Sequence, residues 1–303
     1  VEVGTELMWK AAAEEGIPRA IFINKLDRER ASFQRTLDQL RTSFGKRVAP
    51  IQIPMGEEAD LSGVARVVTS RVYTYDAGAT RGRQIETYPD GVAKLLSTTH
   101  TALIESVVEA DEKLMEAYFE GVEPPREVMI KAVHHGMLAA EMFPVLVGSA
   151  ASLVGVDMLA EFLIDFAPNP LERLVPPLVM GNLDISADGP TGATVFKTVS
   201  DPFVGKISLI RVFSGSIAHD QVLDLSTGGH ARMHNLFHLQ GKEHTDTATV
   251  ICGDIAAVAK VDGAITGATL RAPTTNIEFA AVEYPSPVME VAVTPRSKND
   301  EDK

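Results

Sequence analysis

The tetrapeptide of Asn24, Lys25, Leu26 and Asp27 carries the side chains best suited to recognition chemistry in this sequence. A carboxylate such as that of Asp27 can accept two hydrogen bonds from adjacent N–H donors on the edge of a planar ring. Each bond to a charged acceptor contributes about 1.5–3 kcal/mol. The stem of Lys25 can cover the face of the ring, and the Asn24 amide can bond the ring or a neighbouring loop. These residue types favour binding of a purine with paired donors on its edge, as guanine has and adenine has not.

A short apolar run and a helical pattern flank the tetrapeptide. Residues 20–23 are apolar and rich in Ile and Phe, which is typical of a buried parallel strand. Residues 33–44 carry apolar side chains at helical spacing. Ligands of open α/β sheets bind outside the carboxyl ends of such strands. The alternative is a polar turn between a strand and a helix, because four residues of this kind also recur by chance.

A second polar turn follows another apolar run and contains Ser149 and Ala150. The tetrapeptide matches N-K-x-D, the guanine-reading element of GTP-binding proteins. In those proteins a later S-A dipeptide offers a backbone N–H to the guanine carbonyl, where adenine carries an amine. By this resemblance, Asn24, Lys25 and Asp27 select guanine, and Ser149 and Ala150 complete the pocket. For the dipeptide alone, a plain strand-to-helix turn is the alternative.

The resemblance extends over nearly the whole chain. The matching stretches are residues 18–28, 104–118, 148–150, 195–215, 252–258 and 284–288. Together they resemble the elongation-factor-G family of bacterial translational GTPases, including its elongation-factor-G-like paralogues. The resemblance implies an α/β partial P-loop GTPase domain with an α/β insertion subdomain, followed by an all-β translation-factor barrel.

The same resemblance implies domain boundaries. Residues 1–175 correspond to the carboxy-terminal half of the GTPase (G) domain, with the insertion subdomain at about 46–140. Residues 176–283 correspond to β-barrel domain II, and residues 284–303 to a truncated start of domain III. Both ends of the chain are therefore expected to be cuts through a longer protein.

Apolar periodicity and turn residues predict the other elements. We expect helices over residues 7–15, 92–119, 127–137 and 153–166, strands over 48–54 and 288–293, and an antiparallel β segment over 61–88. His230, His234 and His238 are four residues apart on an expected strand, which separates neighbours by about 13 Å, too far for one metal ion. Cys252 is expected to be a buried strand residue.

The sequence contains no G-x-x-x-x-G-K-[ST] phosphate cradle. Residues 60–63 match D-x-x-G, but they follow N-K-x-D, the reverse of the family order, so we interpret them as a turn. Without a cradle, Mg²⁺ ligands or switch loops, nothing stabilises charge on a transferring phosphoryl group. We expect no catalytic residue and no GTP hydrolysis in this fragment alone; GTPase activity and Mg²⁺ would belong to the full-length parent.

The resemblance implies a fragment of a ribosome-associated GTPase that binds GTP or GDP and promotes translocation in protein synthesis. One alternative is a divergent paralogue, a nucleotide- and ribosome-binding recycling or protection factor without efficient translocation. Another is a fragment that only supports packing of further domains. Two departures favour divergence: Leu26 stands where the family usually has Met, and Ala151 and Ser152 stand where it usually has Phe-Lys.

The resemblance makes the ribosome the expected partner. Lys197, Lys206 and Arg211 would face ribosomal RNA phosphates or be ordinary surface charge. The net charge of −13 opposes general attraction to nucleic acid but not a local basic patch. A single cysteine precludes an intramolecular disulfide, and no apolar stretch approaches the roughly 20 residues that cross a bilayer. We expect a monomeric, cytoplasmic protein of two domains with no membrane partner.

Overall fold

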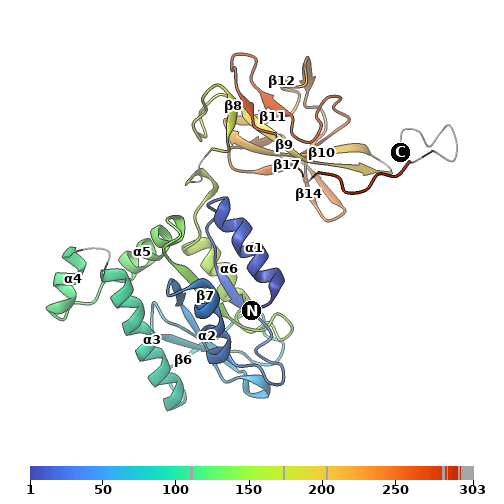
Figure 1. Cartoon of the computed structure of the whole chain (residues 1–303). Coiled ribbons are helices and arrows are strands. Elements are labelled where there is room, and N and C mark those ends of the chain that lie inside the picture. The colour runs from blue at the N-terminus through green and yellow to red at the C-terminus, as the bar shows by residue number, and fades with distance from the viewer. Residues whose placement is uncertain are drawn as a thin grey trace. The chain divides into compact units, whose positions relative to one another are not determined.

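The chain divides into two compact units, Val1–Pro168 and Asn169–Lys303. The computed structural model describes residues 1–109, 112–172, 175–202, 204–281, 284, 286–292 and 294. Figure 1 traces the chain through both units, which are described separately below.

The first unit mixes helices and short strands. Its helices are α1 (Val3–Glu14), α2 (Phe33–Phe44), η1 (Glu58–Asp60), α3 (Asp90–Val108), α4 (Glu112–Phe119), α5 (Arg126–Leu138) and α6 (Val156–Asp165). Its strands are β1 (Ile21–Ile23), β2 (Val48–Pro50), β3 (Gln52–Met55), β4 (Gly63–Arg66), β5 (Arg71–Thr74), β6 (Arg83–Ile85) and β7 (Phe143–Val147).

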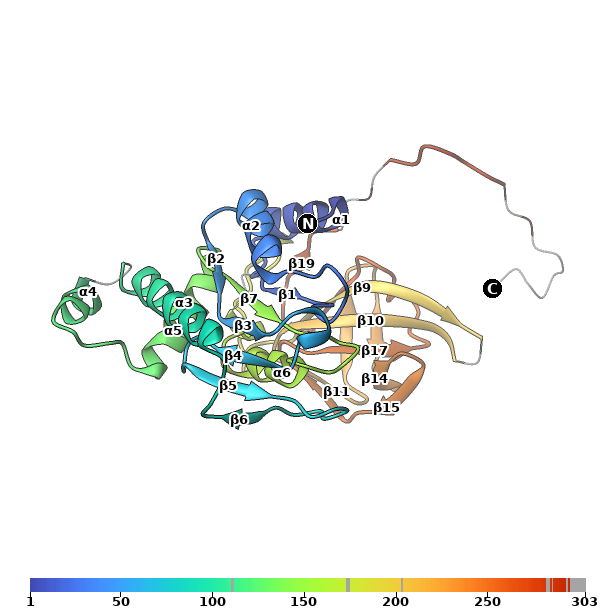
Figure 2. The same cartoon turned by 90° about the horizontal axis from the view of Figure 1, so that it is seen from below.

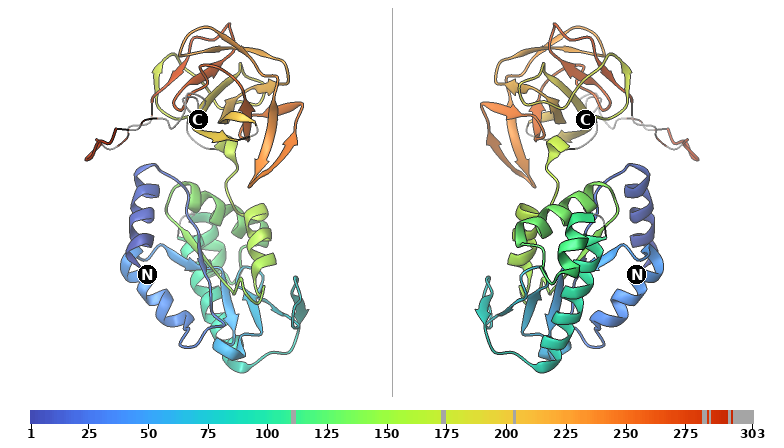
Figure 3. Two further views of the ribbon diagram at one scale, coloured as in Figure 1. Left: turned by 90° about the vertical axis from the view of Figure 1, so that its right-hand side faces the viewer. Right: turned by 90° about the vertical axis from the view of Figure 1, so that its left-hand side faces the viewer.

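A parallel sheet of order β1-β7-β2 lies at the centre of the first unit. All five residues of β7 are buried, as expected for the middle strand of a sheet covered on both faces. Helices α1 and α2 lie on one side of this sheet and α6 on the other (Figure 2, Figure 3). Helix α2 buries Phe33, Leu37 and Leu40, begins at the N-cap Ser32 and ends at Gly45, whose φ is +86°. The predicted α/β architecture is confirmed.

The predicted strand over residues 48–54 is two strands in two sheets. Strand β2 pairs with β7, whereas β3 belongs to an antiparallel sheet of order β3-β4-β5-β6. Ile51, between them, donates its N–H to Val145 O at 3.0 Å and accepts from Val67 N at 3.0 Å. One continuous segment therefore serves both sheets: at the junction, Ile51 bonds to β7 and to Val67, the residue that follows β4.

Three helices precede the return of the chain to β7. The predicted helix over residues 92–119 is divided into α3 and α4, and residues 110 and 111 between them lie outside the described residues. Helix α3 buries Leu96, Leu103 and Ile104 toward the core of the first unit. Helix α5 packs on β7. The predicted antiparallel β segment over 61–88 corresponds to β4, β5 and β6.

The second unit is β-rich. Its elements are η2 (Pro170–Glu172), β8 (Leu178–Met180), β9 (Gly192–Asp201), β10 (Gly205–Ser214), β11 (Ser216–Ala218), β12 (Val222–Leu225), β13 (His230–Arg232), β14 (Leu236–Gln240), β15 (Glu243–Asp246), β16 (Thr249–Ile251), β17 (Ile255–Ala259), β18 (Thr269–Arg271) and β19 (Glu278–Phe279). An eight-stranded sheet has the order β13-β12-β18-β9-β10-β17-β14-β15, beside the pairs β11-β16 and β19-β8. Its core includes Val195, Ile210 and Leu223, all fully buried.

Three sequence-based expectations in the second unit need correction. Cys252 is buried, and its thiol donates to Phe213 O at 3.0 Å, but it lies in a turn after β16 and not in a strand. Burial raises the pKa of this thiol. His230 is in β13 and His238 in β14, with His234 between them, so the three histidines do not share one strand. Strands β13 and β14 pair with different neighbours in the sheet, β12 for β13 and β15 and β17 for β14, so the spacing assumed along one strand does not apply.

The expected strand over residues 288–293 is not formed by its described members. Residues 288–292 have no strand pairing and Val288 is exposed, while Val293 lies outside the described residues. Alternating Val residues predict a strand, but a strand also needs a partner for its backbone groups.

Candidate functional site

The carboxyl ends of β1 and β7 lie side by side. The register pairs Ile23 with Val147, so the two following loops start at the same edge of the sheet. Gly148 N donates to Ile23 O at 3.0 Å, and Leu26 N donates to Gly148 O at 3.3 Å. A Cβ on Gly148 would lie 2.2 Å from Val154 O, so glycine permits this close approach. The two predicted loops therefore meet in space.

The Asn24 side chain joins the two loops directly. Its Oδ1 accepts from the Ala150 N–H at 2.9 Å, a contact between residues 126 positions apart, and from the Lys25 N–H at 2.7 Å. Asn24 thus ties the loops together, one of the two uses predicted for its amide.

One carboxylate oxygen of Asp27 is buried and has no hydrogen-bond donor among the described residues. Among the described residues, Asp27 Oδ1 has no hydrogen-bond partner although it is inaccessible to solvent. The other oxygen, Oδ2, lies 4.0 Å from Arg28 Nε. Burying an acceptor without a donor costs about 1–3 kcal/mol, more for a charged group. The Asp27 side chain as a whole is 23% exposed, so a ligand with N–H donors could remove that cost if the carboxylate turned to present both oxygens to it.

The middle of the tetrapeptide combines an exposed lysine with a buried anchor. Lys25 is exposed and has a φ of +62°, in the left-handed region that non-glycine residues rarely adopt. Leu26 is only 1% exposed and belongs to the core of the first unit. The Leu26 anchor holds the loop, and the Lys25 stem remains free to cover a base.

Ser149 and Ala150 offer no free backbone N–H. Ser149 is fully buried, its N–H donates to Val154 O at 2.9 Å, and its Oγ accepts from Ser152 N at 3.2 Å. The N–H of the exposed Ala150 is donated to Asn24. A guanine carbonyl could use the Ala150 N–H only by sharing or replacing the Asn24 contact, so this assignment stays a prediction.

A hollow of about 380 Å³ adjoins the tetrapeptide on the side of α1 and α2. Asn24, Lys25 and Leu26 are among the residues that line it, with Ile21 and Arg35. Asp27, Ser149 and Ala150 do not line it. The residues predicted to read the base are therefore divided: Asn24 and Lys25 line this hollow, whereas Asp27, Ser149 and Ala150 lie outside it.

Helix α6, which follows the Ser149–Ala150 loop, has one polar face that bonds to neighbouring elements of the first unit. Gly155, with a φ of +80°, precedes the helix, and a Cβ there would lie 2.4 Å from Val147 O. Asp157 accepts from the Tyr75 hydroxyl at 2.5 Å and from Gly82 N at 3.0 Å. Burial, then the bond to Asp157 and its charge, raise the pKa of Tyr75.

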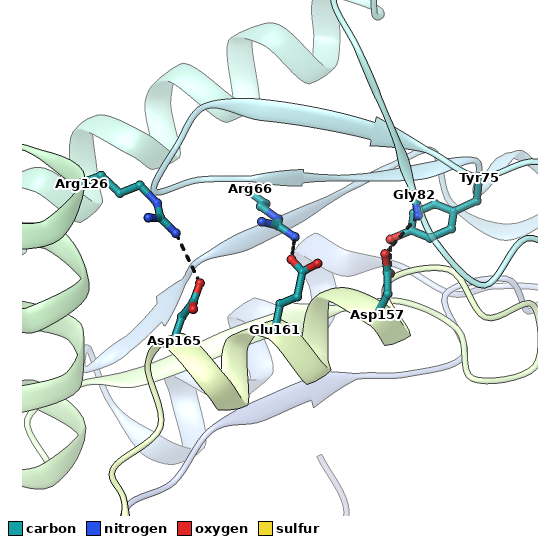
Figure 4. A network of polar contacts seen from close by, with 7 residues as sticks. All are labelled: Arg66, Tyr75, Gly82, Arg126, Asp157, Glu161 and Asp165. Carbon is teal, nitrogen blue, oxygen red and sulfur yellow. Dashed lines mark hydrogen bonds and ion pairs between the residues drawn. The ribbon is translucent and has the colours of Figure 1, made fainter.

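Figure 4 shows this polar face of α6. Its acids recur every four residues: Glu161 pairs with Arg66, and Asp165 lies 3.3 Å from Arg126. Arg66 comes from β4 and Arg126 from α5, so strands and a helix between the two loops of the site hold α6 in place.

The sequence reasoning missed Glu57 and Glu58, which contact the loop after β1. Glu58 N donates to Leu26 O at 2.7 Å, and Glu57 Oε1 accepts from Phe33 N at 2.6 Å. The signal for them is a glycine and two acids directly after a strand, Gly56-Glu57-Glu58, where Gly56 has a φ of +83°. The turn could have been predicted from these residues. Its contact with the loop after β1 could not.

Parallel strands with polar loops at their carboxyl ends are the part of an α/β domain where ligands bind. The family model of the Elongation factor Tu GTP binding domain matches residues 1–169, and that of Elongation factor G domain 2 matches residues 190–272. The chain belongs to the family of translation-factor GTPases that the Elongation factor Tu GTP binding domain defines, and guanine nucleotide is the ligand of that family. The two family models confirm the predicted GTPase-domain and second-domain folds.

A solved structure resembles the whole chain. The chain is similar to a protein of Thermus thermophilus with a TM-score of 0.82 and 29% sequence identity, over 99% of this chain. The chain spans 43% of the length of that protein. Among the described residues, no helix combines the length and apolarity needed to cross a membrane.

The basic residues considered for RNA contact differ in exposure. Lys197 in β9 is exposed, whereas Lys206 and Arg211 in β10 are half-buried. The Arg211 guanidinium lies 5.6 Å from the centre of the Phe213 ring. Of the three, Lys197 is the most accessible for a phosphate contact.

Proposed function

We propose that the chain is the guanine-reading part of a ribosome-associated translational GTPase of the elongation-factor-G type, one that promotes translocation. In this proposal Asn24, Lys25 and Asp27 select the base, and Ser149 and Ala150 complete the pocket. GTP and GDP are the ligands, and Mg²⁺ belongs to the phosphate site of the full-length protein.

The observation that carries the proposal is the buried, unpartnered Oδ1 of Asp27 beside two joined loops. Guanine has a ring N–H and an exocyclic amine on one edge, and both can donate to a carboxylate. Adenine lacks this pair of donors, so the site would discriminate by leaving a buried charge unsatisfied.

A change in base preference tests the role of Asp27. In the full-length protein, Asp27→Asn should weaken GDP binding about 100-fold, because two bonds to a charged acceptor are lost. It should improve binding of xanthosine diphosphate, since xanthine presents a carbonyl where guanine presents an amine. Titration of both fluorescent nucleotides against wild type and variant measures this change. Asp38→Asn, on an exposed position of α2, is the control. An unchanged base preference would contradict the assignment.

A divergent paralogue remains the second candidate, favoured by Ala151 and Ser152 in place of the usual Phe-Lys. Such a protein would bind nucleotide and ribosome and act in recycling or protection. A ribosomal translocation assay with the full-length protein separates the two: translocation at each GTP turnover supports the first, and ribosome-stimulated hydrolysis without translocation supports the second.

We also propose that this 303-residue chain does not hydrolyse GTP by itself. Its sequence holds no phosphate cradle, and preorganised charge around the phosphates supplies most of the rate of phosphoryl transfer. Phosphate release from GTP, with and without ribosomes, tests this; turnover by the isolated chain would contradict it.

A further inference from the structure

The loop after β3, residues 56–60, supports the loop that carries the tetrapeptide. Glu58 makes two of the contacts: its N–H donates to Leu26 O at 2.7 Å, and its Oε1 accepts from Arg30 N at 3.0 Å. Glu57 makes the third, from Oε1 to the N–H of Phe33, the first residue of α2, at 2.6 Å. The 56–60 loop therefore touches the tetrapeptide loop at its beginning, middle and end.

The supported backbone is strained. Lys25 and Arg30 each have a φ of +62°, and Glu58 itself has a φ of +55°. A left-handed conformation costs an L-residue other than glycine about 1–2 kcal/mol and persists only where the surroundings impose it. The Glu58 carboxylate bonds the N–H of one of these strained residues, Arg30. The Arg35 side chain bonds the carbonyl of that same residue.

The charge of the two glutamates is unfavourable for an anionic ligand. A nucleoside diphosphate carries negative phosphates, so nearby acids weaken its binding through Coulomb repulsion. Their carboxylates instead accept backbone N–H groups at 2.6 and 3.0 Å. Bonds of a charged acceptor to backbone donors are stronger than neutral ones. Such bonds favour a role in holding the backbone over a direct contact with the ligand.

We infer that Glu58, assisted by Glu57, is a positioning residue for guanine recognition: it fixes the shape of the tetrapeptide loop so that Asp27 meets the base edge. This role rests on the proposed function. It also makes the segment between the two loops of the site part of the binding apparatus, because the 56–60 loop belongs to that segment.

Substitutions at Glu58 separate this role from a simple charge effect. Glu58→Ala removes the acceptor for Arg30 N and should weaken binding of fluorescent GDP by the full-length protein about tenfold. Electrostatics alone would strengthen binding, because a negative charge is removed. Glu58→Gln keeps an acceptor oxygen of the same reach and should bind within about threefold of wild type. Glu29→Ala, which removes an exposed acid of the same loop, should not weaken binding.

The backbone contact itself can be followed by hydrogen exchange. The Arg30 amide should exchange about tenfold faster in Glu58→Ala than in wild type and Glu58→Gln, while amides of β7 stay unchanged. Fluorescence of Trp9, the only tryptophan, reports whether the first unit remains folded. If Glu58→Ala does not fold, Glu58→Asp replaces it, because it keeps the charge and shortens the side chain by one methylene; it too should weaken binding.

The outcomes distinguish this role from the proposed function. If wild type binds GDP and folded Glu58→Ala or Glu58→Asp binds it equally well, the positioning role is wrong and the proposed function stands. If Glu29→Ala weakens binding as much as Glu58→Ala, the effect is not that of the Arg30 contact, and the role is again wrong. If wild type binds no guanine nucleotide, both fail together.

Discussion

The two units use left-handed backbone differently. In the second unit the described positive-φ positions are mainly glycines, at turns such as Gly228 and Gly229 between β12 and β13. In the first unit, several are not glycine and border the candidate site: Lys25, Arg30, Glu58 and Leu153. Hairpin turns need residues in the left-handed backbone conformation, which glycine adopts at low cost.

The difference separates turns that serve folding from the loops of the candidate site. A hairpin needs only a change of direction, so glycine suffices. The loops at the ends of β1 and β7 instead hold particular side chains in fixed positions, and strain there is imposed by the contacts of Asn24, Glu57 and Glu58. Substitutions in the loops after β1 and β7 should therefore change ligand binding. Substitutions in the hairpin turns of the second unit should mainly change stability.

The largest expected effect comes from glycine substitutions matched between the units. Gly155→Ala should lower the free energy of unfolding of the first unit by about 3 kcal/mol, because a Cβ there lies 2.4 Å from Val147 O in a left-handed conformation. Gly228→Ala should cost the second unit about 1 kcal/mol, since no atom lies within 4 Å of its Cβ. Urea unfolding followed by Trp9 fluorescence and by circular dichroism separates the units. Equal losses would contradict the comparison.

Much of the fold follows from patterns along the chain. The apolar runs that became β1 and β7, and the placement of N-K-x-D and S-A after them, allowed the meeting of the two loops to be predicted. The division of residues 48–54 between two sheets could not be predicted, because an apolar run shows burial but not which strand accepts its hydrogen bonds. The same limit applies to residues 288–292, which have Val residues but no strand partner.

The sequence allowed the side chains of the candidate site to be proposed, but not the residues that hydrogen-bond its backbone. Side chains suited to reading a base have types set by the chemistry of the base, so Asn24 and Asp27 could be proposed from the sequence. Glu57 and Glu58 act through backbone groups of Phe33, Arg30 and Leu26. Backbone donors are the same for every residue type, so no pattern in the sequence identifies which pairs meet.

Tyr75→Phe tests how much the hydrogen bond between Tyr75 and Asp157 of α6 stabilises the first unit. Loss of the bond to Asp157 should lower the stability of the first unit by about 1.5 kcal/mol at neutral pH. In wild type the pKa of Tyr75 is raised above the ordinary value of about 10, so its contribution is present below pH 10 and is lost as pH rises further. Unfolding between about pH 8 and 11 should show a steeper alkaline decline in wild type than in Tyr75→Phe. Parallel declines would contradict this account.

Asn24→Ala tests the tie between the loops. It removes the acceptor of the Ala150 and Lys25 N–H groups and should cost about 1 kcal/mol of stability. GDP binding should weaken about tenfold, because the loops are no longer held together. Asn24→Asp keeps an acceptor oxygen and should retain the stability. Trp9 fluorescence in urea and a fluorescent-GDP titration measure the two quantities. A loss of stability without loss of affinity would mean that the tie serves folding alone.

Two lysines with nearly the same φ give the test with the smallest expected effect. Lys25 has a φ of +62° in the site and Lys260 a φ of +57° in the second unit. Glycine relieves left-handed strain but adds chain entropy to the unfolded state, so each Lys→Gly change should stabilise its unit by about 0.5–1 kcal/mol. Only Lys25→Gly should weaken GDP binding, since it removes the stem that covers the base and loosens the loop. A gain of stability joined to a loss of affinity at Lys25, with the gain alone at Lys260, would show that Lys25 serves recognition at a cost in stability. Equal affinities of the two variants would instead make Lys25 an ordinary turn residue.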